Sequence, residues 1–227
     1  MPRDTLDRQL QHLKDEVLLL GSMVEQAMLA AVDALKRRDQ TTAKQIYRRD
    51  PLINEKRYAI ENAILILIAT QQPMARDLRM MAAILEVTTE LERMGDYAKG
   101  IAKVTIRLGD APLPIGMQDV SRMTDLAVSM LHRALSAFIN ENAAQAHEIP
   151  NEDDEVDELY NQIYHELVQA MIANPETIDQ ANLLMWVAHN IERLADRVTN
   201  ICERTVFIAT GELMEFDATD DEDDEFE

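Results

Sequence analysis

Apolar residues recur every three or four positions along most of the chain, the spacing that is typical of amphipathic helices. At the N-terminal end this spacing runs unbroken through Leu6, Leu13, Val17, Val24 and Leu35. The same periodicity recurs further along and predicts an all-α protein with few, long helices. The expected helices cover residues 4–38, 41–47, 51–70, 75–108, 117–140, 153–173 and 176–210.

Proline and glycine residues mark the ends of these expected helices. Asp50 is a suitable N-cap for a helix that has Pro51 at its first position. Gln72-Pro73 and Asn174-Pro175 interrupt the helical pattern, and Pro150 and the glycines at 109 and 211 end it elsewhere. The whole chain of 227 residues contains only 6 Gly and 7 Pro, which agrees with long helices and few turns.

The chain also repeats itself. The pentapeptide at 92–96, Glu-Arg-Met-Gly-Asp, returns at 192–196 as Glu-Arg-Leu-Ala-Asp, and residues 23–35 resemble 123–135 at the same offset of 100. A third match joins residues 50–54 to 153–157 at an offset of 103, which indicates a small insertion in the first connection of the second copy. We therefore predict two tandem three-helix bundles related by internal duplication. Their expected bounds are residues 1–109 and 110–211, followed by an acidic tail over 212–227.

Charge is distributed unevenly between the two copies. Residues 1–109 carry 17 Lys and Arg against 15 Asp and Glu, whereas residues 110–227 carry 5 against 27. Ten acids fall in 212–227, so we expect that segment to be disordered. A net charge of −20 offers no electrostatic surface for nucleic acid.

The sequence points to a reducing, aqueous compartment. The longest apolar run, residues 63–69, is too short to cross a membrane, and the charged N-terminus lacks the apolar centre of a signal peptide. Cys202 is the only cysteine, so an internal disulfide is excluded. We expect a cytoplasmic protein in which Cys202 and Trp186 belong to the core.

Paired carboxylates are the candidate chemistry of this chain. Two acids four residues apart lie on one face of a helix and repel each other, so helix formation does not require them. Such pairs occur in the third helix of each copy, and a similar spacing opens the second helix. If these helices pack antiparallel, each bundle can gather four oxygen-bearing side chains. The candidate metal ligands are Asp50, Glu92 and Asp96 in the first copy, and Asp153, Asp157, Glu192 and Asp196 in the second.

Oxygen ligands without His or Cys suit Mg²⁺, Mn²⁺, Ca²⁺ or iron, and Zn²⁺ is the least favoured ion. The alternative is that these acids are solvated or act as helix caps, with Arg93 or Lys99 as neutralising partners. None of the five histidines follows a Glu by three residues, which argues against a di-iron oxidase. No phosphate-binding glycine loop or nucleophile motif is present, so we expect no enzymatic activity.

Several segments resemble the PhoU-like regulators of bacterial phosphate uptake. They are residues 72–79 (QPMARDLR), 91–96 (LERMGD), 189–201 (HNIERLADRVTNI) and 207–212 (FIATGE). The resemblance covers about residues 4–215. It implies a cytoplasmic regulator that links a phosphate-specific ABC transporter, through its nucleotide-binding subunit, to a phosphate-sensing histidine kinase. That regulator would repress the phosphate-starvation response when phosphate is plentiful.

The resemblance also implies metal binding through the duplicated acidic motifs, with the seven acids named above as ligands. Asn54 departs from the family pattern, which tends to have Asp at this position, and this weakens the first cluster by one charge. The acidic tail is a further departure. We also expect a homodimer that meets the membrane only through its partners. The alternative function is a metal store, or another carboxylate-metal helical protein, unrelated to phosphate signalling.

Overall fold

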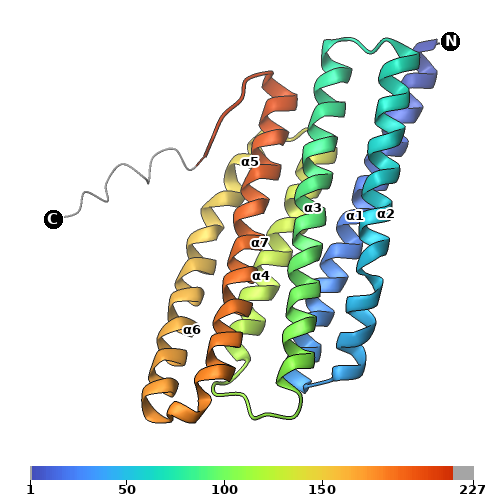
Figure 1. The fold of residues 1–227 in the computed structure, drawn as a ribbon. Coiled ribbons are helices and arrows are strands. Elements are labelled where there is room, and N and C mark those ends of the chain that lie inside the picture. Colours follow the sequence, from blue (N-terminus) through green and yellow to red (C-terminus); the bar gives the residue numbers. More distant parts are fainter. Residues whose placement is uncertain (1, 217–227) are drawn as a thin grey trace.

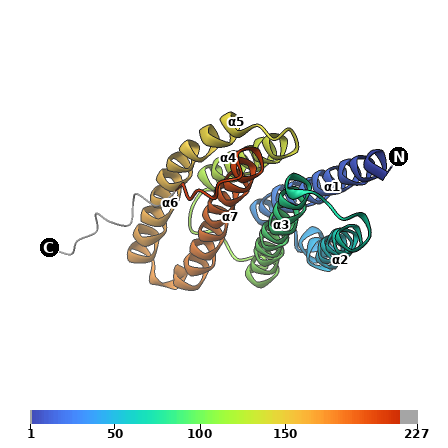
Figure 2. The same cartoon turned by 90° about the horizontal axis from the view of Figure 1, so that it is seen from above.

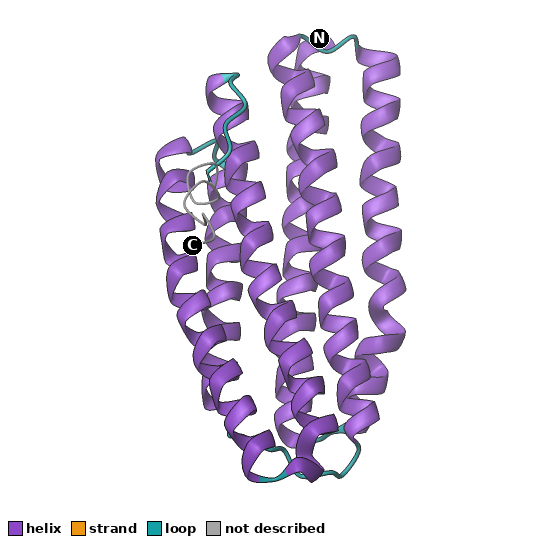
Figure 3. Cartoon of the chain, turned by 60° about the vertical axis from the view of Figure 1, so that its left-hand side comes forward, coloured by secondary structure: helices purple, strands orange, loops and turns teal. Residues whose placement is uncertain are grey.

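The computed structural model describes residues 2–216, and within this range it contains only helices and their connections (Figures 1 and 3). The helices run side by side, and most of them span the length of the molecule. In chain order they are α1 (Pro2–Arg37), α2 (Gln40–Gln71), α3 (Ala75–Leu108), α4 (Gln118–Ile139), α5 (Ala143–Glu148), the 3₁₀ helix η1 (Ile149–Glu152), α6 (Asp153–Ala173), the 3₁₀ helix η2 (Pro175–Thr177) and α7 (Ile178–Thr210).

The helices form two bundles, as Figure 2 shows from above. The first consists of α1, α2 and α3, and the second of α4, α6 and α7 with the short α5. The bundles meet where α1 contacts α4 and α3 contacts α7. The predicted all-α fold of two tandem three-helix bundles is therefore confirmed.

The repeat is visible in the backbone as well as in the sequence. Arg38 ends the first helix in the left-handed region (φ +56°), and Glu141 does the same at an offset of 103 (φ +54°). The next residue caps a helix in each copy. Asp39 accepts hydrogen bonds from the amides of Thr41 and Thr42, and Asn142 accepts one from Gln145. The three extra residues of the second copy therefore lie near the end of α4, before this shared turn.

The predicted break at residue 50 is wrong for the first copy. α2 is continuous from its cap at Asp39, and Pro51 lies in its interior. A proline inside a helix removes a hydrogen bond and costs about 3 kcal/mol. The preceding turns are held by tertiary contacts, because Ala43 is fully buried and Asp50, which we expected to be an N-cap, is only 6% exposed. In the second copy the equivalent stretch is divided into α5, η1 and α6 around Pro150.

A single apolar core extends through both bundles. Leu20, Leu91, Leu131 and Leu194 are completely buried, and they come from α1, α3, α4 and α7, the four helices at the junction. Gly100 allows α7 to approach α3 closely, because a Cβ at this position would lie 2.2 Å from the Trp186 ring. The core is therefore shared between the two repeats.

Two side chains outside the carboxylate motifs, Cys202 and Trp186, were predicted to lie in the core. The expectation of a buried thiol is confirmed for Cys202, and burial, with a smaller effect of Glu203, raises its pKa to about 12. Trp186 was expected in the core, but it is 44% exposed because it packs one side on α3 at the edge of the junction.

Two further expectations concern α1 and the C-terminal segment. α1 has the length and apolar composition of a membrane-spanning helix, yet its regularly spaced leucines and valines face the core. In the segment predicted as a tail, the Phe216 amide donates to Glu203, and its ring packs 5.0 Å from that of His147. Residues 217–227, the rest of the predicted tail, lie outside the described residues.

Candidate functional site

The first carboxylate cluster joins the N-terminal half of α2 to α3, as we expected from antiparallel packing of these helices. Lys99 of α3 lies between two of the predicted ligands. Its Nζ is 2.7 Å from Oδ2 of Asp50 on α2 and 3.3 Å from Oδ1 of Asp96 on α3. The hydrogen bond to Asp50 outweighs the effect of burial and raises the pKa of Lys99 above its ordinary value. One ammonium group of the chain therefore already pairs with both of these acids.

Glu92, the third predicted ligand of this cluster, faces a different cation. Nη1 of Arg57, on α2, is 3.5 Å from Oε2 of Glu92, and Nε of the same side chain donates to Glu61 at 2.9 Å. Arg57 was missed in the sequence analysis. Its position seven residues after Asp50 places it on the same face of α2, and this spacing could have identified it.

In the second cluster, Glu192 has surroundings different from those of Glu92. Burial, followed by the charges of Asp196 and Asp157, raises the pKa of Glu192 to about 7, against a smaller opposing effect of Arg193. Oε2 of Glu192 is buried and makes no hydrogen bond, although Nδ1 of His189 lies 3.1 Å away. Burial and the neighbouring acids therefore favour the protonated form of this carboxyl group, and a cation bound beside it would favour the ionised form.

The described residues contain no group of three or more His, Cys, Asp or Glu side chains that is placed to hold a metal ion. The structure does bring Asp50 and Asp96 together through Lys99, and it places Glu192 within electrostatic reach of Asp157 and Asp196. The acids of the first cluster do not fit a metal, because cations of the chain already occupy their faces. The acids of the second cluster fit a metal ion in their charge and in their ligand type.

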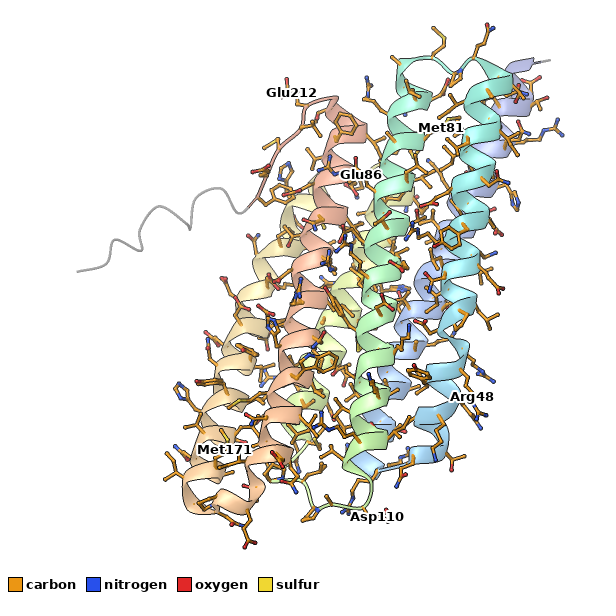
Figure 4. The ribbon with its side chains drawn as sticks, viewed as in Figure 1. Arg48, Met81, Glu86, Asp110, Met171 and Glu212 are labelled. Carbon is orange, nitrogen blue, oxygen red and sulfur yellow. The ribbon has the colours of Figure 1, made fainter. Side chains whose placement is uncertain are left out.

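A polar contact between the bundles lies close to these clusters. Arg197 of α7 donates to the Tyr97 hydroxyl and to Glu90 of α3, both at 2.6 Å. Further up, Arg204 pairs with Glu86 at 2.7 Å, in the upper half of α3 (Figure 4). Glu86, Glu90 and Arg197 were also missed, because they hold the repeats together and are not themselves repeated.

Comparison with known proteins agrees with the duplicated architecture. The chain matches the PhoU domain family twice, over residues 17–105 and 120–205. It is 34% identical to a phosphate-specific transport system accessory protein PhoU homologue of Clostridium acetobutylicum, over 95% of this chain and 99% of that protein. A homologue of the same description from Caulobacter vibrioides is 37% identical, over 91% of this chain and 90% of that protein.

Solved structures give the same result. The phosphate transport system regulatory protein PhoU from Streptococcus pneumoniae superposes with a TM-score of 0.86 at 33% identity, covering 92% of this chain and 99% of that one. PhoU from Pseudomonas aeruginosa gives 0.85 at 29% identity, over 91% and 99%. These relatives are accessory and regulatory proteins, as expected for a chain without catalytic motifs. Because both repeats and nearly the whole length match, the chain belongs to the PhoU family.

Proposed function

We propose that this protein is a cytoplasmic regulator of phosphate uptake that represses the phosphate-starvation response when phosphate is plentiful. It would act as an adaptor between the nucleotide-binding subunit of a phosphate-specific ABC transporter and a phosphate-sensing histidine kinase. The observation that carries the proposal is the match to the family in both repeats, with relatives named as accessory or regulatory proteins of phosphate transport. The same names favour this function over the alternative of a metal store.

The outer face of α2 suits an adaptor. This helix contacts only α1 and α3 among the described elements, so one side of it is exposed. Ile64 and Leu67 face the core, whereas Leu65 and Ile66 on the other side are 60% and 54% exposed. A helix that is apolar on both sides buries its second side against a partner. We propose this face as the contact with the nucleotide-binding subunit.

The proposal is tested by co-purification with the nucleotide-binding subunit. We expect the wild-type protein to retain the subunit and Leu65→Glu/Ile66→Glu to lose it. Ile172→Glu is the matched control, because Ile172 is 78% exposed on α6, in the other bundle. If the folded wild-type protein repeatedly fails to retain a folded subunit, the adaptor role is wrong. If all three proteins retain it, the proposed surface is wrong and the role stands.

Metal binding is proposed for the second bundle alone. Asp153, Asp157, Glu192 and Asp196 would supply the oxygen ligands after their side chains turn toward one another. A divalent or iron cation bound there would neutralise the cluster and connect α6 to α7. The buried, unbonded oxygen of Glu192 and the charges that raise its pKa support this assignment.

Elemental analysis of protein purified without chelator tests the metal proposal. Glu192→Ala/Asp196→Ala should lower bound metal while the helical content by circular dichroism stays the same. Unfolding of this variant would mean that the acids maintain the fold, and unchanged metal content would exclude them as ligands. The proposed homodimer is checked separately by light scattering.

A further inference from the structure

The two carboxylate clusters occupy equivalent places in the repeat, but their surroundings have diverged. Glu92 and Asp96 correspond to Glu192 and Asp196 at an offset of 100, and Asp50 corresponds to Asp153 at 103. Three of the differences exchange an acid or a permanently charged cation next to the clusters. Reading first copy to second, they are Asn54 to Asp157, Arg57 to Tyr160, and Lys99 to Thr199. At these three positions the first copy thus has one acid fewer and two cations more.

The structure supports these equivalences through the contacts that each side chain makes. Arg57 lies beside Glu92, and Tyr160 is close enough to Glu192 to sense its charge. Lys99 reaches across to α2, whereas Thr199 is buried within the second bundle and carries no charge. The exchanged residues therefore face the clusters themselves.

Lys99 lies where a bridging cation would be needed. Its ammonium group contacts one acid from each of the two helices, and one of these acids, Asp50, is only 6% exposed. There is space for an ion beside this pair, because Asp50 and Lys99 line a cavity of about 530 Å³ between α1, α2 and α3. A divalent ion entering that cavity would be repelled by the Lys99 ammonium group, which already lies within hydrogen-bond distance of Asp50 and Asp96, the acids that would bind the ion.

We infer that Lys99 and Arg57 are built-in counterions that replace a metal in the first bundle, so that this bundle binds no divalent cation. The helices α2 and α3 are then held together independently of metal supply, and any response to a cation is confined to the second bundle. The inference is independent of the adaptor role. Its first test below does not depend on whether the second bundle is loaded, whereas its second test rests on the metal proposal for the second bundle.

Mn²⁺ binding to the full chain, measured by equilibrium dialysis after chelator treatment, tests the inference in two ways. In the first, Glu92→Gln/Asp96→Asn is compared with the wild type, and we expect identical Mn²⁺ stoichiometry and affinity. Loss of a bound ion in this variant would overturn the inference. Glu192→Gln/Asp196→Asn is the matched variant in the other bundle, and it reports on the separate metal proposal.

The second test exchanges the divergent residues. Asn54→Asp/Arg57→Tyr/Lys99→Thr gives the first cluster the residues of the second at the three divergent positions, and we expect one additional Mn²⁺ per chain. The additional ion should disappear when Glu92→Gln/Asp96→Asn is added, and Mn²⁺ should raise the melting temperature of the triple variant more than that of the wild type. A folded triple variant that binds no more Mn²⁺ than the wild type would overturn the inference if Glu192→Gln/Asp196→Asn shows that the second bundle binds the ion, and would overturn the metal proposal as well if it does not. If the triple variant does not fold, the comparison in the wild-type background still decides the question.

Discussion

Glu92 and Glu192 show how far the surroundings of two residues in the same motif can differ. Both stand at the head of a Glu-Arg-x-x-Asp segment in the third helix of their copy. Glu92 is met by the guanidinium of Arg57, whereas burial and two neighbouring acids raise the pKa of Glu192 to about 7. The motif alone is therefore insufficient to predict the surroundings of its glutamate, which depend on burial and on residues of both packed helices.

The raised pKa of Glu192 makes stability depend on pH. Its folded pKa lies above the ordinary 4.5, so the folded protein holds a proton that the unfolded chain releases, and stability falls as pH rises from about 4.5 to 7. Glu192→Gln removes this loss. We expect urea unfolding in chelator to show equal stability at pH 4.5 and a gain of about 1–2 kcal/mol at pH 8, once solvent screening is allowed for. Glu92→Gln, which loses an ion pair, should show no gain at pH 8, and a gain there would contradict this account.

Gly100 and Trp186 form a close contact between the repeats. A methyl group at residue 100 would overlap the indole, so Gly100→Ala should displace Trp186 and lower the free energy of unfolding by about 1–3 kcal/mol. Trp186 is the only tryptophan in the chain, so its fluorescence spectrum reports the displacement directly. Adding Trp186→Leu should restore part of the stability. An unchanged spectrum in Gly100→Ala would show that the contact is looser than described.

At the scale of elements, α2 is where the prediction from sequence failed. Asp50-Pro51 has the composition of a helix start, and the second copy does change helix near the equivalent place. In the first copy, Ala43 packs against Ala34 and Ala102, and Asp50 pairs with Lys99. These contacts join helices that are distant in the sequence, so a local pattern cannot reveal them.

The pair between α3 and α7 should matter more than an exposed pair. The side chains of Arg197 and Glu90 are only 13% and 20% exposed, so Arg197→Met leaves a partly buried carboxylate unpaired and should cost about 1–3 kcal/mol in chemical denaturation. Arg122→Met is the control, because Arg122 and Glu155 are 61% and 45% exposed and the loss should be below about 1 kcal/mol. Equal losses in the two variants would contradict the importance of the inter-bundle contact.

At the scale of the whole molecule, the shared core unites the two repeats into one cooperative unit. Residues from both bundles belong to one apolar cluster that crosses between α1 and α4 and between α3 and α7. We expect a single unfolding transition, with the same midpoint by circular dichroism and by Trp186 fluorescence. Separate midpoints would show that the bundles fold independently. A fragment of residues 1–109 should be much less stable than the full chain, because it exposes its half of that core.

The sequence was sufficient for the helical fold, the duplication and the positions of the acidic motifs, because all three are local or periodic features. It was not sufficient for the side chains that pair with those motifs or for the pairs that join the two bundles. Arg57, Glu90 and Arg197 act across helices, and their importance depends on which faces meet. The same limit applies to Lys99, which was considered as a neutralising residue, but whose link to Asp50 depends on how α2 and α3 pack.

The regulatory role is tested most directly in cells, with a reporter of phosphate-starvation gene expression in a strain that lacks this protein. The account predicts that the reporter is active in high phosphate without the protein and is repressed again when the wild-type chain is restored. Leu65→Glu/Ile66→Glu, expressed at the same level, should restore less repression than Ile172→Glu. A reporter that stays repressed in high phosphate after deletion would contradict the proposed function.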